Sequence, residues 1–290
     1  MKRYFLFILL VLISLGGWAQ GVIYESLTFS STLLGEDVKY SVYLPADYDL
    51  SERKYPVLYL LHGYTDDETG WVQFGEVKAI ADKAIKSGES TEMIIVMPDA
   101  KVSYYSNDHA MKYPWEDMFV KEFIPFVEET YKVRQKKEFR ALAGLSMGGF
   151  GALKLAMRHN ELFSSSVAMS AAVRTDKQII EMESEKYEKV YGLLYGPNLK
   201  GRKRITESWK NNSVFHLMNS IDLEGLNSVR YYIDCGDDDF LIEGNMSLHL
   251  TMNKKGIKHE FRVRDGGHSW QYWRTCLPTA LEFVSKSFHR

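Results

Sequence analysis

Short apolar runs alternate with amphipathic stretches along most of the chain, and this pattern predicts alternating strands and helices. The expected strands lie at 22–32, 38–45, 55–64 and 93–100 and in FRALAGLS, FSSSVAMS, SVRYYIDCG and HEFRVRDGG. The run 55–64 is continuously apolar, as in strands that are covered on both faces. Helical patterns lie between the runs, at about 71–86 and in an amphipathic stretch with Pro114 near its start. Such alternation predicts an α/β fold with a mainly parallel central sheet and helices on both faces.

The segment from about 172 to 226 breaks this alternation. It is charged and partly helical, and it lacks a run typical of a buried strand. Because the runs on both sides of it read as strands of one sheet, we interpret it as an insertion over the edge of that sheet. The chain from 21 to 290 is therefore expected to form a single domain with one lid-like insertion.

The first 20 residues have a different pattern. Lys2 and Arg3 precede an apolar run from Tyr4 to Leu15, and small and polar residues follow up to Gln20. This order is typical of a secretory signal peptide over residues 1–20. The run is too short for a membrane-spanning helix, which needs about 20 apolar residues. We therefore expect a secreted or periplasmic protein with no stable membrane insertion after cleavage.

Composition narrows the class of partner. Of the 290 residues, 45% are hydrophobic, which allows a substantial core, and the formal net charge at pH 7 is −2. Acidic and basic residues are interspersed, so the sequence has no basic stripe that would neutralise a nucleic-acid backbone. A small neutral or mildly charged substrate is the better expectation. Two cysteines, Cys235 and Cys276, allow either one disulfide or two buried thiols, and the sequence does not decide between them.

The stretch RALAGLSMGGFGALKLAMRHN contains the pattern Gly-x-Ser-x-Gly, with Ser146 at its centre. The pattern alone is weak, because glycine is common in proteins. Its setting is more specific, since a strand-like run precedes it and an apolar helical pattern follows it. A strand, a sharp turn and a helix in this order are the setting of a nucleophile elbow. Ser146 is thus the candidate nucleophile, with the positive end of the following helix directed at the site.

A serine nucleophile needs a base, and in this type of site the chain order is serine, acid, histidine. After Ser146, only His268 lies in a glycine-flanked loop that follows the last expected strand. The other histidines beyond Ser146 fall on helical stretches, in the insertion, at a strand start or at the terminus; they are His159, His216, His249, His259 and His289. His268 is therefore the candidate base.

The acid is expected after the run SVRYYIDC, where the sequence reads DCGDDDF. Asp234 falls within the strand, whose pleat sets the direction of its side chain. Asp237, Asp238 and Asp239 follow Gly236 in the loop, and one of them is expected to orient the imidazole. An acidic solvated turn or a weak calcium site is the alternative, although the run lacks the spacing of a calcium-binding loop. The pattern by itself does not choose among the three aspartates.

Five motifs occur in order along nearly the whole chain that follows the expected signal peptide: LLHGYTDDETGW, MPDAKVSYYSN, GLSMGGFGAL, CGDDDFL and GGHSWQYW. Their order and approximate spacing resemble those of the esterase D family of the α/β-hydrolase superfamily. That family includes feruloyl, acetylxylan and tributyrin-type esterases, S-formylglutathione hydrolases and mycolyltransferases. The resemblance implies an α/β-hydrolase fold.

The resemblance also implies site residues. In related esterases the acid is the third residue after the glycine of a CGxxD pattern, which selects Asp239, with Asp238 as the alternative. The tetrahedral intermediate of acyl transfer needs two backbone N–H donors, one from the residue after the serine and one from a residue after an early His-Gly turn. These positions are Met147 and Tyr64. His62, within that turn, is interpreted as a structural residue.

Four aromatic residues lie in or beside the motif loops, at the face where the catalytic residues are expected. Trp71, Tyr104, Tyr105 and Trp270 are candidates to line a substrate pocket, because aromatic rings stack on sugars and aromatic acids. Together with the expected export and the resemblance, they favour a serine carboxylesterase. Its expected substrates are acyl or hydroxycinnamoyl esters of plant polysaccharide or oligosaccharide.

The same resemblance leaves two other reactions as alternatives, which are acyl transfer of the mycolyltransferase type and thioester hydrolysis of the S-formylglutathione hydrolase type. The second is disfavoured because its substrate is mainly cytosolic. A binding module without activity is disfavoured by the complete ordered set of serine, acid and histidine. No metal or organic cofactor is expected, because the sequence has no HExxH, no paired CxxC and no phosphate-binding glycine loop. The pattern does not indicate an oligomeric state.

Overall fold

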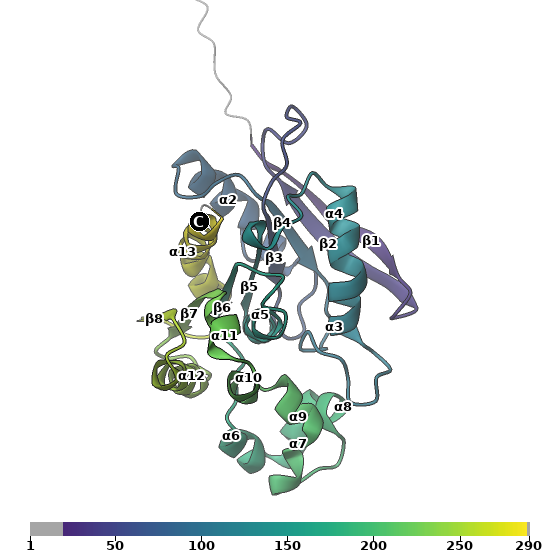
Figure 1. Cartoon of the computed structure of the whole chain (residues 1–290), viewed down its shortest axis with the longest axis vertical. Helices are drawn as coiled ribbons and strands as arrows, with labels where there is room; N and C mark the ends of the chain where they lie inside the picture. The colour runs from purple at the N-terminus through teal and green to yellow at the C-terminus, as the bar shows by residue number, and fades with distance from the viewer. Residues whose placement is uncertain (1–19, 289–290) are drawn as a thin grey trace, which may run out of the picture.

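A computed structural model describes residues 20–288 of the chain. The expected signal peptide lies outside these residues except for Gln20, so export stays a prediction. Within the described residues, eight strands form one sheet in the order β1-β2-β4-β3-β5-β6-β7-β8 (Figure 1). The strands are β1 (Val22–Ser31), β2 (Glu36–Leu44), β3 (Val57–Leu61), β4 (Ile94–Pro98), β5 (Arg140–Leu145), β6 (Ser165–Met169), β7 (Arg230–Gly236) and β8 (His259–Arg264).

The sheet is mainly parallel, as predicted. The pairs β1/β2 and β2/β4 are antiparallel, and each neighbouring pair from β4 to β8 is parallel. Near their carboxyl ends the strands are level, because Leu61 pairs with Gly144, and Met169 pairs with both Leu145 and Asp234. The loops that follow β3, β5, β6, β7 and β8 therefore meet at one end of the sheet, where ligands bind in open α/β folds.

Helices cover both faces of the sheet, which confirms the predicted fold class. Helices α2 and α13 pack on one face, and α3, α4, α5, α10 and α12 pack on the other (Figure 1). The helices are α1 (Gly70–Gln73), α2 (Val77–Lys86), α3 (Trp115–Met118), α4 (Ile124–Thr130), α5 (Met147–Arg158), α6 (Asp176–Glu181), α7 (Ser184–Tyr187), α8 (Leu193–Tyr195), α9 (Glu207–Asn212), α10 (Val214–Ser220), α11 (Leu223–Asn227), α12 (Ile242–Lys255) and α13 (Trp270–Ser287).

Two predicted helices differ in detail from the structure. The stretch 71–86 is divided into α1 and α2 because Glu76 has φ 53°, in the left-handed region that interrupts a right-handed helix. The helix expected near Pro114 begins directly after that residue and passes through a π-helical turn (Phe119–Phe123) into α4. Pro125 lacks an N–H group and would crowd the carbonyl one turn earlier, which accounts for the wider turn at this point.

The insertion consists of helices and short turns between β6 and β7. Helices α6 to α9 gather below the sheet in Figure 1, and α10 packs against α5. The outermost strands of the sheet are β1 and β8, whereas the insertion follows the interior strand β6. The expected position over a sheet edge is therefore wrong in this respect, because the insertion lies at the carboxyl ends of the parallel strands.

A buried charge cluster joins α3 and α5 to the loop after β4. Both carboxylate oxygens of Glu116 accept hydrogen bonds, from Lys154 Nζ at 2.7 Å, Arg158 Nη1 at 2.7 Å and His159 Nε2 at 2.9 Å. Lys154 Nζ also donates to the Tyr105 carbonyl oxygen at 2.7 Å. Burial alone would raise the pKa of Glu116, but the charges and hydrogen bonds of these partners hold it well below its ordinary value. The cluster thereby anchors a loop that reaches the pocket described below.

We expect the substitution Glu116→Gln to lower the free energy of unfolding by about 3–5 kcal/mol, because it leaves the buried Lys154 ammonium without its counter-charge. Urea denaturation at pH 7 measures this difference. The folded-state pKa of Glu116 lies below the unfolded-state value, so its contribution is full above the ordinary carboxyl range and is lost only as the pH falls through the lower value.

The matched control is Glu89→Gln, which removes the charge of an exposed glutamate. We expect its effect on unfolding to stay within about 0.5 kcal/mol. Equal losses of stability in the two variants would contradict the structural role of the buried cluster.

Cys235 and Cys276 are buried free thiols, which resolves the alternative that the sequence left open. Burial raises the pKa of the Cys276 thiol to about 12.

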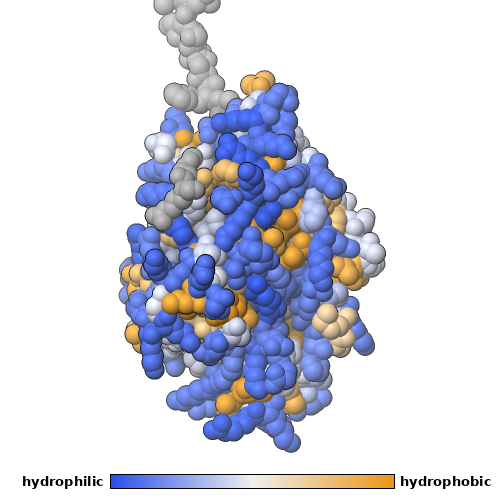
Figure 2. Space-filling view, viewed as in Figure 1, coloured by the Kyte–Doolittle hydropathy of each residue, from blue (hydrophilic) through white to orange (hydrophobic). Residues whose placement is uncertain are grey.

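On the face shown in Figure 2, hydrophilic residues predominate and the apolar residues form several separate groups. Among the helices of residues 20–288, none combines the length and apolar character that crossing a membrane requires.

Candidate active site

Ser146 stands in the sharp turn between β5 and α5. Its backbone has φ 53° and ψ −114°, a strained conformation for a residue with a side chain. A Cβ atom on Gly144 would lie 2.4 Å from the Gly148 carbonyl carbon, and one on Gly148 would lie 2.3 Å from the Leu61 carbonyl oxygen. The Ser146 N–H donates to the Met169 carbonyl oxygen at 2.9 Å. At both glycines of the Gly-x-Ser-x-Gly pattern, therefore, the close approach of the backbone leaves no room for a side chain.

The imidazole of His268 lies between Ser146 and Asp239. Its Nε2 is 3.0 Å from Ser146 Oγ, and its Nδ1 is 2.8 Å from Asp239 Oδ2. An ionised carboxylate can only accept hydrogen bonds, so Nδ1 carries the proton and donates it to Asp239. Nε2 is then free to accept the hydroxyl of Ser146. The three residues come from the loops after β8, β5 and β7, and the structure joins them in one hydrogen-bonded chain.

The Asp239 carboxylate is buried, and its Oδ1 accepts the Leu241 N–H at 2.8 Å. Burial alone would raise its pKa, but the hydrogen bonds from His268 and Leu241 outweigh burial and hold the pKa below its ordinary value. The Ser170 hydroxyl acts in the same direction and also accepts the Trp273 indole N–H at 3.1 Å. Asp239 is therefore held ionised and directed at the imidazole.

Two aromatic rings restrict the orientation of the His268 ring. Its centroid lies 4.6 Å from that of Phe240 and 4.9 Å from that of Trp273, which it meets edge to face at 89°. The Trp273 indole also donates to Ser170, so the packing of His268 and the position of Asp239 depend on the same side chain. Sequence reasoning singled out neither Phe240 nor Trp273, although both lie within the quoted motifs.

Asp234 has a separate, buried network and does not approach His268 in this arrangement. Its carboxylate accepts from the Tyr232 hydroxyl at 2.8 Å and from the Tyr272 hydroxyl, and it lies 3.1 Å from Arg264 Nε. These contacts occupy both carboxylate oxygens. The pleat of β7 thus directs Asp234 into the core, and the loop residue Asp239 supplies the carboxylate that meets the imidazole.

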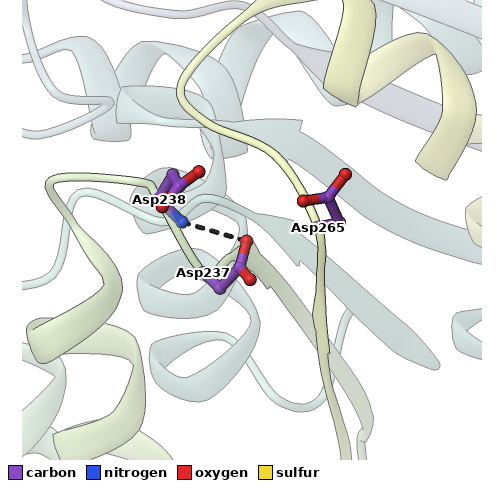
Figure 3. A group of neighbouring side chains, drawn as sticks. All are labelled: Asp237, Asp238 and Asp265. Atoms are coloured by element: carbon purple, nitrogen blue, oxygen red, sulfur yellow. Dashed lines mark hydrogen bonds between the residues drawn. The ribbon is translucent and has the colours of Figure 1, made fainter.

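Asp237, Asp238 and Asp265 form an exposed acidic group beside this loop (Figure 3). Oδ1 of Asp237 accepts the N–H of Asp238 at 3.1 Å and the N–H of Gly266 at 3.0 Å. The second bond joins the loop after β7 to the loop that carries His268. One oxygen from each carboxylate lies within 4.8 Å of the others, but acidic groups on a surface are common. The geometry supports a bracing function for Asp237.

The turn after β3 approaches Ser146 closely. A Cβ atom on Gly63 would lie 3.8 Å from the Cβ of Ser146. His62 is buried, its Nε2 accepts the Ala100 N–H at 2.8 Å, and its Nδ1 donates to the Gly63 carbonyl oxygen at 2.8 Å. Both ring nitrogens of His62 therefore form hydrogen bonds with backbone groups, in agreement with its interpretation as a structural residue.

The two expected oxyanion donors flank Ser146. Met147 is the first residue of α5, so its N–H belongs to the helical turn whose N–H groups have no acceptor within the helix. The positive end of the α5 dipole lies at the same place. Tyr64 follows Gly63 in the adjoining turn and lines the same pocket as Ser146. Their function as oxyanion donors stays a prediction.

Ser146 and His268 line a pocket of about 470 Å³, a size that suits a small organic ligand. One part of the wall comes from the insertion and includes Ala172, Arg174, Lys186, Val190 and Tyr191. Another part comes from the turn after β3 and from the last loop and includes Tyr64, Asp66, Ser269, Trp270 and Trp273. The pocket is thus built by segments that are far apart in the sequence.

Two of the four predicted pocket aromatics line this pocket. They are Trp270 and Tyr104, and the ring centroid of Tyr104 lies 5.3 Å from that of Tyr191. Tyr191 belongs to the insertion, and nothing in the sequence indicated that this segment would contact the aromatic residues of the motifs.

The pocket-lining expectation is wrong for Trp71 and Tyr105, whose side chains are buried one layer behind the wall. The Trp71 indole donates to the Leu61 carbonyl oxygen at 3.0 Å, and its ring supports Trp270 edge to face at 5.2 Å. The Tyr105 hydroxyl donates to the His62 carbonyl oxygen at 2.8 Å. Both residues complete backbone hydrogen bonds beneath the site and do not face a ligand.

Three charged residues of the pocket were not foreseen: Asp66, Arg174 and Lys186. Asp66 lies within a quoted motif, but nothing in the motif distinguishes it from Asp67. Arg174 and Lys186 belong to the charged insertion, where single cations form no pattern. Burial raises the pKa of the Asp66 carboxyl.

Comparisons with known proteins identify the family of the chain. A model of the family described as "Putative esterase" matches residues 30–284. The chain is 25% identical over 275 residues to an acetyl esterase of Caldicellulosiruptor saccharolyticus, covering 90% of this chain and 97% of that protein. It is 29% identical over 270 residues to an endo-1,4-beta-xylanase/feruloyl esterase of Xylanibacter ruminicola, covering 90% of this chain and only 31% of that longer protein.

A solved structure of a ferulic acid esterase is also similar. It shares 35% sequence identity with this chain and superposes with a TM-score of 0.81, over 93% of this chain and 99% of that chain. The likeness therefore extends over almost the whole of both molecules.

Proposed function

The chain belongs to the esterase family of the α/β-hydrolase superfamily and is a carboxylic ester hydrolase, and on this premise we propose that Ser146, His268 and Asp239 are its catalytic residues. The observation that carries the proposal is the hydrogen-bonded chain itself. It runs from Asp239 to His268 at 2.8 Å and from His268 to Ser146 Oγ at 3.0 Å, beside a pocket of ligand size.

The proposed reaction proceeds through an acyl-enzyme. His268 Nε2 takes the proton of Ser146 as Oγ forms a bond to the ester carbonyl carbon, and Asp239 stabilises the imidazolium. The N–H groups of Tyr64 and Met147 donate to the developing oxyanion. His268 then gives its proton to the departing alcohol. In the second half, it activates a water molecule, which cleaves the acyl–serine bond and releases the acid.

We infer that the substrates are esters of short or planar acyl groups, such as acetyl and hydroxycinnamoyl esters. The pocket wall combines the flat rings of Trp270 and Tyr104 with Val190 and Tyr191 of the insertion, which limit the space beside Ser146. The relatives described as an acetyl esterase and as feruloyl or ferulic acid esterases support these two acyl classes. With the export predicted from residues 1–20, plant polysaccharide or oligosaccharide is the proposed alcohol component.

We expect kcat/KM for p-nitrophenyl acetate and methyl ferulate to exceed that for p-nitrophenyl laurate by about tenfold or more. A long flexible chain would have to displace the wall formed by Val190 and Tyr191. The comparison of acetate, butyrate, laurate and ferulate esters tests this selectivity, because kcat/KM reports discrimination in the transition state.

The variant Val190→Ala should narrow the difference in kcat/KM between the acetate and laurate esters, because it removes two methyl groups from the pocket wall. Its control is Leu193→Ala on the same segment, whose side chain is 80% exposed and does not line the pocket. A wild-type preference for laurate would overturn the proposed substrate class and indicate a lipase-like enzyme, while leaving the three catalytic residues in place.

A further inference from the structure

Two cations of the insertion, Arg174 and Lys186, face the same pocket as the nucleophile. Arg174 enters the site on a segment that is fixed to the elbow, because the Ala172 N–H donates to the Ser146 carbonyl oxygen at 2.8 Å. Lys186 is exposed on α7, and so lies where solvent and substrate reach it. Neither side chain takes part in the hydrogen-bonded chain of the three catalytic residues.

Arg174 lacks the partners that the other enclosed arginines have. Arg140 pairs with Glu128, Arg158 pairs with Glu116, and Arg204 donates to several backbone carbonyl oxygens. Within residues 20–288, by contrast, no carboxylate forms an ion pair with Arg174, and its buried Nε has no hydrogen-bond acceptor. A buried N–H without an acceptor is unfavourable, and the loss is greater for a charged group.

The surroundings of Arg174 favour a ligand as the missing acceptor. Its neighbours along the pocket wall are the rings of Tyr104 and Tyr191, which offer little charge compensation. The pocket has a single lining carboxylate among the described residues, Asp66, which lies near Trp270 and forms no ion pair with Arg174 or Lys186. The positive and negative groups thus occupy different walls of the pocket.

We propose that Arg174 and Lys186 form a subsite for a carboxylate group on the ester substrate, and this rests on the proposed esterase function of the same pocket. The planar guanidinium of Arg174 suits two-point bonding to a carboxylate, and the Lys186 ammonium adds a second positive charge at the exposed side. The Asp66 carboxylate repels an anion from the Trp270 wall and so favours the insertion wall.

The carboxylate has two possible sources in an ester. It lies on the acyl part in a half-ester of a dicarboxylic acid, or on the alcohol part in an oligosaccharide with a uronic acid residue. In either case the reaction at Ser146 is the same, since the carboxylate only positions the ester. Two pairs of substrates distinguish the sources.

The first pair is mono-p-nitrophenyl succinate and p-nitrophenyl butyrate, which have acyl chains of equal length and differ in one charge. The second pair is acetylated xylo-oligosaccharide with and without a glucuronic acid branch. We expect wild-type protein to show a kcat/KM about tenfold or more higher for the charged member of one pair, chiefly through a lower KM. This preference should decrease with added NaCl, because salt screens the partly exposed charges.

Substitutions then assign the preference to residues. Arg174→Gln should reduce the charged-to-neutral ratio by about tenfold, and Lys186→Gln by a smaller factor. The matched control is Lys189→Gln, which removes an exposed charge from the same insertion outside the pocket and should leave the ratio unchanged. Thermal unfolding of each variant checks the fold, and the wild-type ratio and its salt dependence need no variant.

The outcomes separate this inference from the proposed function. Equal kcat/KM for both members of both pairs in the wild type would overturn the carboxylate subsite while leaving the esterase proposal intact. A preference for charged substrates that persists in Arg174→Gln would also overturn it. Failure of the wild type to cleave any ester, or cleavage that persists in Ser146→Ala, would instead contradict the proposed function.

Discussion

Ser146→Ala should reduce kcat for ester hydrolysis by about 10⁵- to 10⁶-fold while leaving the fold unchanged. The alanine has no atom that can form the acyl bond, and residual turnover would come only from binding and the oxyanion donors. The fold should persist because the one hydrogen bond of Ser146 Oγ in the described residues is to His268, whereas the backbone bonds of the elbow do not involve the side chain. Turnover of p-nitrophenyl acetate measures the loss.

A chemical readout makes this test independent of trace contamination. A phosphonate ester that reacts with activated serines should add one covalent group to the wild type and none to Ser146→Ala, as seen by mass spectrometry of the intact protein. Circular dichroism and the melting temperature of the variant provide the folding control. A folded Ser146→Ala protein with near-normal turnover, or an adduct on another serine, would refute the assignment.

Asp239→Asn should lower kcat by about 1,000- to 10,000-fold with a small change in KM. An amide N–H directed at Nδ1 favours the tautomer in which Nε2 carries the proton, and that nitrogen then cannot accept the proton of Ser146. The effect depends on the 2.8 Å contact between Asp239 Oδ2 and His268 Nδ1. Steady-state kinetics with p-nitrophenyl acetate measure both constants.

The neighbouring aspartates are natural controls for this effect. Asp237→Asn retains an Oδ1 atom that can accept the N–H groups of Asp238 and Gly266, so we expect kcat within about threefold of the wild type. Asp238→Asn changes an exposed side chain and should also have a small effect. If Asp238→Asn were the variant that loses activity, the acid would be one residue earlier than proposed.

Ser146, the proposed nucleophile, illustrates what local sequence is able to predict. Gly144 and Gly148 are required by backbone contacts within a few residues of Ser146, and such requirements appear in the sequence as a compact pattern. The alternation of strands and helices has the same character, because each buried strand needs a continuous apolar run of its own. The order of the strands in the sheet does not follow from these runs.

Asp239, the proposed acid, shows what a local sequence pattern cannot predict. Asp237, Asp238 and Asp239 are chemically identical neighbours, and the resemblance to known esterases was needed to prefer Asp239. The structure distinguishes them by burial, since Asp239 is 1% exposed while Asp237 and Asp238 are exposed. Burial of one aspartate in a run depends on how the loop folds against Ser170 and Leu241, which composition does not encode.

The direction in which a side chain points near the pocket is likewise not predicted by local sequence. Tyr104 and Tyr105 are adjacent in the sequence, and both have positive φ, 53° and 54°. Tyr104 turns toward the pocket, whereas Tyr105 turns into the core beneath His62. Proximity to a motif places a residue near the site, but only the packing of its neighbours decides which way the side chain points.

The sequence by itself predicted the α/β class, which depends on short-range periodicity, and a candidate nucleophile at Ser146, which depends on glycine contacts near the elbow. It also predicted a candidate base at His268, from the chain order of such sites and from a glycine-flanked loop after the last strand. Tertiary structure alone decided the break between α1 and α2 and the place of the insertion at the carboxyl ends of the strands. It also decided that Arg174 and Lys186 line the pocket. Those features depend on contacts between segments that are far apart in the chain. Such contacts select among conformations that the local sequence leaves nearly equal in free energy.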